Sequence, residues 1–185
     1  METIAILGSR NPEGQTARAT KALLAGLGCE NPDECMIFLP SMEIEVCRQC
    51  DAQGWGLCRS ENRCVIQDDF EEIVGKIRDA DVVVFATPVY FADLSESLRA
   101  FLDRFRRAHR PKDGDEAGLG EKTTVGICVA GGGGGGAPNC AASLEKILAI
   151  SGLDVFDMVP ARRQNLDLKV DVLRRTGEYI AQQQA

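Results

Sequence analysis

Short apolar runs alternate with amphipathic stretches along the whole chain. The runs contain few polar residues, and the stretches between them repeat apolar residues every three or four positions, as amphipathic helices do. Apolar runs without polar alternation predict strands that are buried on both faces, and therefore a parallel sheet covered by helices on both sides. The predicted strands are residues 4–7, 35–39, 81–87, 123–130 and 153–159.

The predicted helices follow these strands one by one. Asp68 with Glu71 three residues later predicts the start of the second helix, with Asp68 as its cap. Strict alternation of five strands and five helices predicts a flavodoxin-like three-layer sandwich with strand order 2-1-3-4-5. The helical patterns begin or centre at Thr16–Leu27, Phe70–Ile77, Leu94–Phe105, Ser143–Ser151 and Leu166–Ile180.

No internal repeat or linker divides the 185 residues, so we expect a single domain over 1–185 with a cysteine-rich insertion at about 45–66. Residues 110–121 mix Pro, Gly and charges and predict an exposed loop. No apolar run is long enough to span a membrane, and the N-terminus lacks the pattern of an export signal. We therefore expect a cytoplasmic protein.

The formal net charge of −7 argues against nucleic acid and anionic membranes as partners, because binding phosphate groups requires a basic surface. Eight cysteines are many for a chain of this size. In a reducing compartment they are expected to be thiols, metal ligands or redox groups rather than a disulfide framework.

The segment that joins the first predicted strand to the first helix predicts an anion site. It runs from Gly8 to Thr16 and is rich in small and turn-forming residues. A loop of this kind before a helix directs free backbone N–H groups and the positive end of the helix dipole at one point. Gln15 stands where a triphosphate-binding loop has Lys, so a single terminal phosphate suits this loop better. An ordinary turn is the alternative.

Two further loops follow strands at the same predicted edge of the sheet. Thr87–Ser95 carries Tyr90 and Phe91 side by side, which could stack on a planar heterocycle or simply plug the end of the sheet. Gly131–Gly136 lets backbone amides approach a ligand without a Cβ in the way, or is a mobile linker. A phosphate site, an aromatic platform and an amide-lined rim together match the needs of flavin mononucleotide (FMN).

The chain resembles the NAD(P)H-dependent FMN reductases and the iron–sulfur flavoproteins. The resemblance rests on Gly8-Ser9-Arg10, on Gly14-Gln15-Thr16, and on Pro88-Val89-Tyr90-Phe91 leading into residues 98–104. It implies that Ser9, Arg10, Gly14, Gln15 and Thr16 hold the FMN phosphate. It also implies that Pro88, Val89, Tyr90 and Phe91 border the isoalloxazine and that Gly131, Gly132 and Gly133 cover its pyrimidine side.

The resemblance further implies an oxidoreductase in which the flavin carries reducing equivalents from NAD(P)H to a small acceptor such as free flavin or a quinone. No side chain is assigned as a catalytic acid or base, since the cofactor carries the chemistry. A homodimer or homotetramer is expected by the same resemblance. The alternatives are an electron-transfer flavoprotein that does not use nicotinamide directly, and a non-redox phosphate-binding module.

The cysteine-rich segment has more than one interpretation; its cysteines are Cys47, Cys50, Cys58 and Cys64. Four cysteines within eighteen residues can close a tetrahedral thiolate site for zinc or a [4Fe–4S] cluster. The seven residues between Cys50 and Cys58 weaken this interpretation, since the family that it resembles has a tighter run there. Reduced thiols, or one local disulfide within Cys47–Cys50 or Cys58–Cys64, are the favoured alternative.

The remaining candidates have structural interpretations. His109 ends a basic helix, where contact with the helix dipole explains it; binding of a 2′-phosphate by the neighbouring arginines is a remote alternative. Trp55 is expected to pack over the flavin crevice or at a subunit interface. Packed thiols are expected at Cys29, Cys35, Cys128 and Cys140.

Overall fold

The computed structural model describes residues 1–109, 119 and 122–184. Five parallel strands form one sheet with the order β2-β1-β3-β4-β5, which confirms the predicted topology. Of the loop predicted at 110–121, only Leu119 is among the described residues. The strands are β1 (Thr3–Leu7), β2 (Met36–Phe38), β3 (Val82–Pro88), β4 (Thr123–Ala130) and β5 (Asp154–Arg162).

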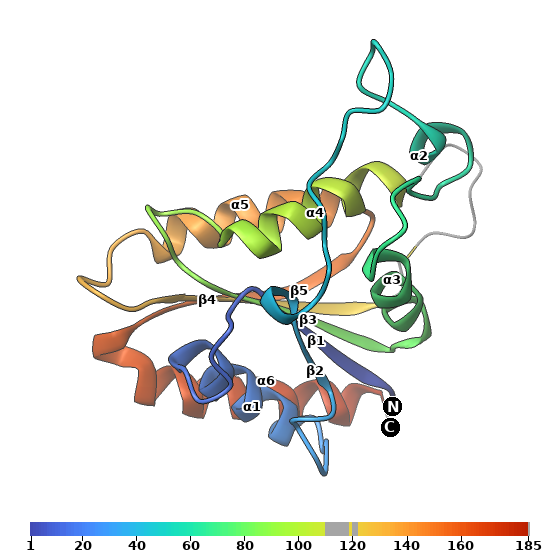
Figure 1. Cartoon of the computed structure of the whole chain (residues 1–185). Helices are drawn as coiled ribbons and strands as arrows, with labels where there is room; N and C mark the ends of the chain where they lie inside the picture. Colours follow the sequence, from blue (N-terminus) through green and yellow to red (C-terminus); the bar gives the residue numbers. More distant parts are fainter. Residues whose placement is uncertain (110–118, 120–121, 185) are drawn as a thin grey trace.

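Helices cover both faces of the sheet (Figure 1). Two of them, α1 (Gln15–Gly26) and α6 (Leu166–Gln183), pack together on one face. The other face carries α3 (Phe70–Asp79), α4 (Glu96–Ala108) and α5 (Ala137–Ile150), while α2 (Leu57–Ser60) belongs to the cysteine-rich segment. Short 3-10 turns follow β2 (Leu39–Ser41) and β5 (Arg163–Asn165).

Each face of the sheet has its own apolar core because the side chains of a strand alternate between its two sides. Ile4 and Ile6 of β1 pack with α3, α4 and α5, while Ala5 and Leu7 face α1 and α6. Phe70, Phe85, Phe101 and Phe105 fill the first core and are fully buried. Two-sided burial explains why the strands are apolar without alternation.

Two predicted helix starts differ from the structure. The helix α5 begins at Ala137, before the predicted Ser143, because Pro138 is well suited to a first turn. Asp68 and Glu71 do not form a capping box: the Glu71 carboxylate accepts the Cys64 N–H instead of reaching back to the cap. Asp68 still accepts the Phe70 N–H, but its main partner is Arg104. Among the described residues, no helix is both long and apolar enough to cross a membrane.

Candidate functional site

The loop between β1 and α1 leaves the amides at the helix start free of side-chain caps. Gly14 is the N-cap residue and supplies no side chain. Inside the loop, Asn11 organises the turn: its side-chain oxygen accepts the Glu13 N–H at 3.0 Å and its carbonyl accepts the Gly14 N–H at 3.1 Å. The first N–H groups of a helix have no partner within the helix. At α1 they are therefore available to an anion.

The five residues predicted to hold a phosphate lie in this loop and in the first turn of the helix. Thr16 is buried, Ser9, Gly14 and Gln15 are partly buried, and Arg10 is exposed. The Gln15 side chain has a buried amide oxygen with no hydrogen-bond partner among the described residues. A buried polar atom without a partner is rare and costly. This oxygen is an acceptor, so Gln15 would serve a phosphate with its amide turned, when its NH2 group donates to a phosphate oxygen. The residues present fit a phosphate group.

The loop between β3 and α4 projects its aromatic side chains into solvent. Tyr90 and Asp93 pair across a tight turn through two backbone hydrogen bonds of 3.0 and 2.9 Å. The turn residues Phe91 and Ala92 have φ of 50° and 65°, which L residues rarely adopt. Phe91 is fully exposed and Tyr90 is half exposed. The prediction that these rings might plug the end of the sheet is therefore wrong.

Buried hydroxyl groups fix this loop to the end of the sheet. The Ser95 N–H donates to Thr87 Oγ1 at 3.0 Å, and both residues are buried. The Ser97 hydroxyl donates to the Gly8 carbonyl at 3.2 Å, which connects the start of α4 to the β1–α1 loop. A Cβ at Gly8 would collide with the Ser95 hydroxyl, so the close approach of these two segments requires glycine there.

The glycine tract between β4 and α5 has an open half and a packed half. A Cβ built on Gly131, Gly132 or Gly133 meets nothing within 4 Å, so these three residues expose bare backbone to open space. Gly136 has φ of 80°, and a Cβ there would lie 2.5 Å from the Cα of Ala92. The tract is thus held against the aromatic loop, and its open half is a cradle of backbone that a flat ligand edge could occupy.

The three loops predicted to converge do meet at the carboxyl edge of the sheet. Figure 1 shows the connections after β1, β3 and β4 leaving the sheet on the same side. Contacts link them in pairs, through Gly8 with Ser97 and through Gly136 with Ala92. In open α/β sheets, ligands bind at this edge, where the strand order reverses between β1 and β3.

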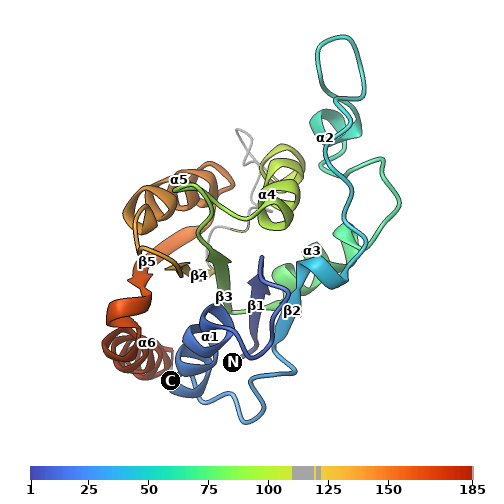
Figure 2. The same cartoon turned by 60° about the vertical axis from the view of Figure 1, so that its left-hand side comes forward.

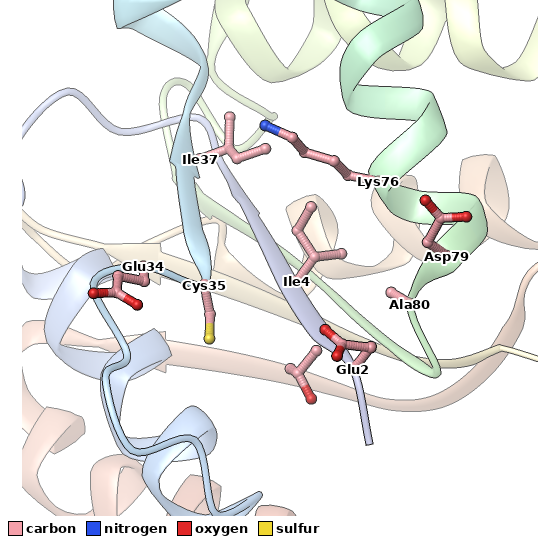
Figure 3. A pocket seen from close by; sticks show the side chains of 9 residues that line it. Glu2, Ile4, Glu34, Cys35, Ile37, Lys76, Asp79 and Ala80 are labelled. Atoms are coloured by element: carbon pink, nitrogen blue, oxygen red, sulfur yellow. The ribbon is translucent and has the colours of Figure 1, made fainter.

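A separate hollow lies at the opposite, amino edge of the sheet (Figure 3). The starts of β1 and β2 and the end of α3 line it, with Glu2, Glu34 and Asp79 among the side chains. Lys76, which also lines it, is already paired with Glu72 at 2.8 Å. None of the residues predicted to bind FMN lies there.

The cysteine-rich segment extends away from the sandwich (Figures 1 and 2). Hydrogen bonds join the two ends of this segment where it leaves the sandwich. The Asp68 carboxylate accepts the Glu45 N–H at 2.9 Å and the Arg104 guanidinium from α4. The Arg104 guanidinium also donates to the Glu45 carbonyl at 3.1 Å. The two ends of the segment are thereby joined through one buried ion pair, which the sequence analysis did not find.

Burial favours the neutral forms of Asp68 and Arg104, whereas their ion pair favours the charged forms. Burial works to raise the pKa of the Asp68 carboxyl, but the hydrogen bonds from Arg104, Glu45 and Phe70 outweigh it and hold that pKa below its usual value. The guanidinium also lies over the Phe70 ring, 4.2 Å from its centre. Arg104 Nε has no hydrogen-bond partner among the described residues.

All four cysteines of the segment line one small hollow against the second half of α4. Arg104 and Arg107 line the same hollow. Cys47, Cys50, Cys58 and Cys64 are free thiols, so the predicted local disulfides are wrong. Within the described ranges, no group of three or more Cys, His, Asp or Glu side chains has the arrangement of a metal site. The four thiols therefore line one hollow, but they do not have the geometry of metal ligands.

Trp55 belongs to this hollow and not to the predicted flavin crevice. Two guanidinium groups lie near its ring, that of Arg107 at 5.0 Å and that of Arg59 at 5.7 Å from the ring centre. The Gly54 carbonyl accepts a hydrogen bond from Arg107 at 2.7 Å. The cysteine-rich segment is therefore docked on the basic end of α4 through cation–π contacts and hydrogen bonds.

His109 is buried in the aromatic core and is not explained by the helix dipole. Its ring lies against Phe70 and Phe105, with centres 6.2 and 5.4 Å apart. Arg78 donates to its Nδ1 at 3.2 Å, which places the proton of the neutral ring on Nε2. Burial, together with the positive charge of Arg78, lowers the pKa of His109 to about 4.

The other four cysteines divide into two pairs. Cys29 and Cys35 form a disulfide, so the prediction of packed thiols is wrong for them. Cys128 and Cys140 are buried free thiols, as predicted. A hydrogen bond with Cys140 and burial raise the pKa of the Cys128 thiol, which therefore stays protonated.

The sheet order and the three loops at its carboxyl edge define a flavodoxin-like α/β protein. Residues 1–165 match the family described as NADPH-dependent FMN reductase. The chain belongs to this family, which confirms the resemblance drawn from its loops. The family is thus established on most of the chain.

Relatives and solved structures agree with this assignment. An iron-sulfur flavoprotein of Methanocaldococcus jannaschii is 34% identical over 106 residues, covering 57% of this chain and 52% of that protein. An FMN-dependent NADH:quinone oxidoreductase of Thiobacillus denitrificans is 28% identical over 164 residues, covering 85% of this chain and 72% of that protein. The chain spans about half the length of the iron-sulfur flavoproteins that it matches.

Solved structures share the fold at lower identity. A flavone reductase superposes with a TM-score of 0.70 at 18% identity, covering 98% of this chain and 62% of that chain. An FMN-dependent NADH-azoreductase from Bacillus anthracis, in complex with FMN, superposes with a TM-score of 0.64 at 12% identity, covering 98% and 100%. At these identities the likeness supports the fold alone.

Proposed function

We propose that this protein binds FMN at the carboxyl edge of its sheet and transfers reducing equivalents from NAD(P)H to a small acceptor, such as free flavin or a quinone. When bound, the flavin supplies the redox chemistry, taking a hydride from the nicotinamide and giving its reducing equivalents to the acceptor. The observation that carries the proposal is the meeting of three loops with three complementary properties: uncapped helix amides, exposed aromatic rings and bare glycine backbone.

The helix start binds the terminal phosphate in this proposal. The free amides at the start of α1, the partial positive charge of the helix end and the Thr16 hydroxyl receive the anion, and Gln15 completes its hydrogen bonding by turning its amide. Ser9 and Arg10 close the loop side. Only one cation, Arg10, belongs to this set, which suits a single phosphate.

The other two loops hold the ring system. Pro88, Val89, Tyr90 and Phe91 border one face, where exposed aromatic rings exclude water and position a planar partner. The backbone amides of Gly131, Gly132 and Gly133 face the acceptor-rich pyrimidine edge. Donors held there before the reaction stabilise negative charge that develops on that edge as the ring is reduced.

The purified chain tests this proposal through its spectrum and its response to nicotinamide. Flavin absorbance, with about one FMN per chain, is expected in the purified or FMN-reconstituted protein. Anaerobic addition of NADPH or NADH should bleach these bands within turnover time, and an added quinone should restore them. Protein that binds FMN but ignores both nicotinamides would favour an electron carrier. Protein that takes up no FMN would overturn the oxidoreductase and leave a non-redox phosphate-binding module.

The cysteine hollow favours a second candidate function, an electron-transfer flavoprotein with a [4Fe–4S] cluster that does not use nicotinamide directly; zinc in the same place would be structural. Four thiols line one hollow beside two arginines, which would offset thiolate charge. The thiols would have to move together to act as ligands. Anaerobic protein with about four iron atoms per chain, lost in Cys50→Ala and retained in Cys128→Ala, would support this function. Zinc at about one atom per chain would show a structural metal site instead. Metal-free, fully folded protein from anaerobic cells would end it.

The proposal extends to the location, the partners and the oligomeric state of the protein. Six of the eight cysteines are free thiols, which suits a reducing cytoplasm, while the Cys29–Cys35 disulfide runs against that pattern. The acidic net charge of −7 leaves small molecules, not nucleic acid or anionic membranes, as the proposed partners. A homodimer or homotetramer remains our expectation from the resemblance.

A further inference from the structure

The outer face of α6 carries apolar side chains that are largely exposed to solvent. Leu168, Val172 and Tyr179 are 64%, 40% and 52% exposed, and their spacing places them along one side of the helix. Phe156 of β5 is 47% exposed, and its ring lies 6.0 Å from that of Tyr179. Together these four residues form what we call the α6–β5 patch. A shallow hollow runs through it, lined in part by Phe156, Val172 and Tyr179.

The inner face of the same helix already accounts for its folding. Leu166, Leu173 and Ile180 are buried in the core on the side of α1. A helix at the surface of a monomer normally pairs one apolar face with a polar one. Here apolar residues occupy both faces, and contiguous exposed patches of this kind mark sites of protein association.

Two opposite charges flank the middle of the patch, one helical turn apart. Asp171 and Arg175 both line the hollow. The described part of the chain gives Asp171 no ion pair, and Arg175 pairs only with the exposed Glu178 at 3.1 Å. Exposed pairs of that kind contribute little, so Arg175 can change partner at small cost.

We propose that the α6–β5 patch is the contact surface of a homodimer, with a second copy of this chain as its occupant. A two-fold axis between positions 171 and 175 sets the two α6 helices antiparallel. Asp171 of each copy then faces Arg175 of the other, and Leu168 faces Tyr179. A two-fold contact needs a surface that is complementary to itself, and this order of charges meets that requirement.

The edge position of β5 agrees with contact through side chains and not through strand pairing. The strand lies at the end of the sheet order (Figure 2), and Asp154 and Asp157 place charges on it. Inward or edge charges discourage addition of a further strand. The chain also has a net charge of −7, which repels unspecific association, so a matched pair of charges gives this contact its specificity.

Charge-reversal variants of the full chain test the inference. Their self-association is measured by sedimentation velocity at about 1 to 100 µM protein, the range in which contacts with micromolar dissociation constants form. Asp171→Arg alone brings four positive groups together at the axis, and Arg175→Asp alone brings four negative ones. Each single variant should weaken self-association by roughly tenfold or more. The double variant Asp171→Arg/Arg175→Asp restores opposite charges and should recover association to within a few-fold of the wild type.

The matched control is Glu145→Arg, an exposed charge reversal on the far helix α5, which should leave association unchanged. Circular dichroism verifies that each variant is folded. Fall of a wild-type tetramer to dimers in the single variants supports the inference equally. A monomeric wild type overturns it, as does a dimer that ignores both single variants or is not rescued in the double variant. The result does not depend on FMN binding, so it stands or falls separately from the proposed function.

Discussion

The guanidinium of Arg104 and the carboxylate of Asp68 form a two-pronged ion pair, at 2.5 and 2.8 Å, with side chains only 1% and 4% exposed. The pair joins α4 to both ends of the cysteine-rich segment, through the backbone of Glu45 and the start of α3. A buried pair of this kind contributes little net stability compared with apolar residues, but loss of one partner leaves a bare charge inside the protein. Its position makes it the anchor of that segment.

Arg104→Met should therefore lower the free energy of unfolding by about 3–5 kcal/mol, because the Asp68 carboxylate loses its counter-ion in a buried site. Urea denaturation measures the change. The matched control is Lys76→Met, which breaks the exposed pair with Glu72 and should cost less than about 1 kcal/mol. Equal effects in the two variants would show that Asp68 is solvated and that the two ends of the segment separate.

His109 should make stability fall as the solution becomes acidic. Its pKa is lowered from 6.5 to about 4 in the folded state. Between these values the unfolded chain binds the proton more readily, so the stabilisation is complete above pH 6.5 and is lost as the pH falls toward 4. A shift of this size corresponds to about 3 kcal/mol.

The variant His109→Phe isolates this effect, since a ring remains between Phe70 and Phe105 but no longer titrates. Unfolding free energies from pH 7 to pH 4 should decline more steeply in the wild type than in the variant, by about 3 kcal/mol over the range. Parallel curves would mean that His109 is protonated in the folded protein and that Arg78 has moved away.

The sheet could be predicted because its determinants are local. The central strands β1 and β3 are apolar runs, and the residues that end them, Gly8 and Pro88, are recognisable from their residue types alone. The edge strand β5 is less regular, because Asp154 and Asp157 interrupt its apolar residues. The convergence of three loops followed from topology alone, since parallel strands bring their carboxyl ends to one edge. What each loop binds stays a proposal.

The ion pair was missed because its partners are thirty-six positions apart and each has a plausible local role. Asp68 fits a helix cap, and Arg104 fits a basic helix end. A weak signal was present: Arg104 falls on the same side of α4 as Phe101 and Phe105, where a solvated arginine is out of place. His109 was misjudged for the same reason, since its burial depends on contacts with Phe70 from another helix.

A substitution at Thr16 can distinguish a role in phosphate binding from a role in helix packing. It lies in the first turn of α1 and is buried, and its carbonyl accepts a hydrogen bond from the Thr20 hydroxyl at 3.0 Å. If FMN binds as proposed, Thr16→Val should weaken it by roughly 1–3 kcal/mol, because a phosphate oxygen loses its partner. Thr20→Val is the matched control, buried one turn later on the same face. Fluorescence titration of the apoprotein measures both affinities, and an equal loss in the two variants would remove Thr16 from the phosphate site.

Phe91 combines an unfavourable backbone with an exposed ring, and we expect the two to have opposite consequences. Its φ of 50° costs energy that glycine does not pay, so Phe91→Gly should raise the free energy of unfolding by about 1 kcal/mol. The same change removes the ring that borders the proposed flavin site. The KM for a planar quinone should then rise roughly two- to tenfold, the value of one aromatic contact.

The neighbouring substitution Ala92→Gly is the control, because it relieves a φ of 65° and keeps the ring. It should gain similar stability with an unchanged KM. Strained residues persist where they serve a function, so a stabilised Phe91→Gly with full activity would contradict the role of this ring. Loss of FMN itself in Phe91→Gly would instead assign the ring to cofactor binding, and titration with FMN alongside the kinetics distinguishes the two.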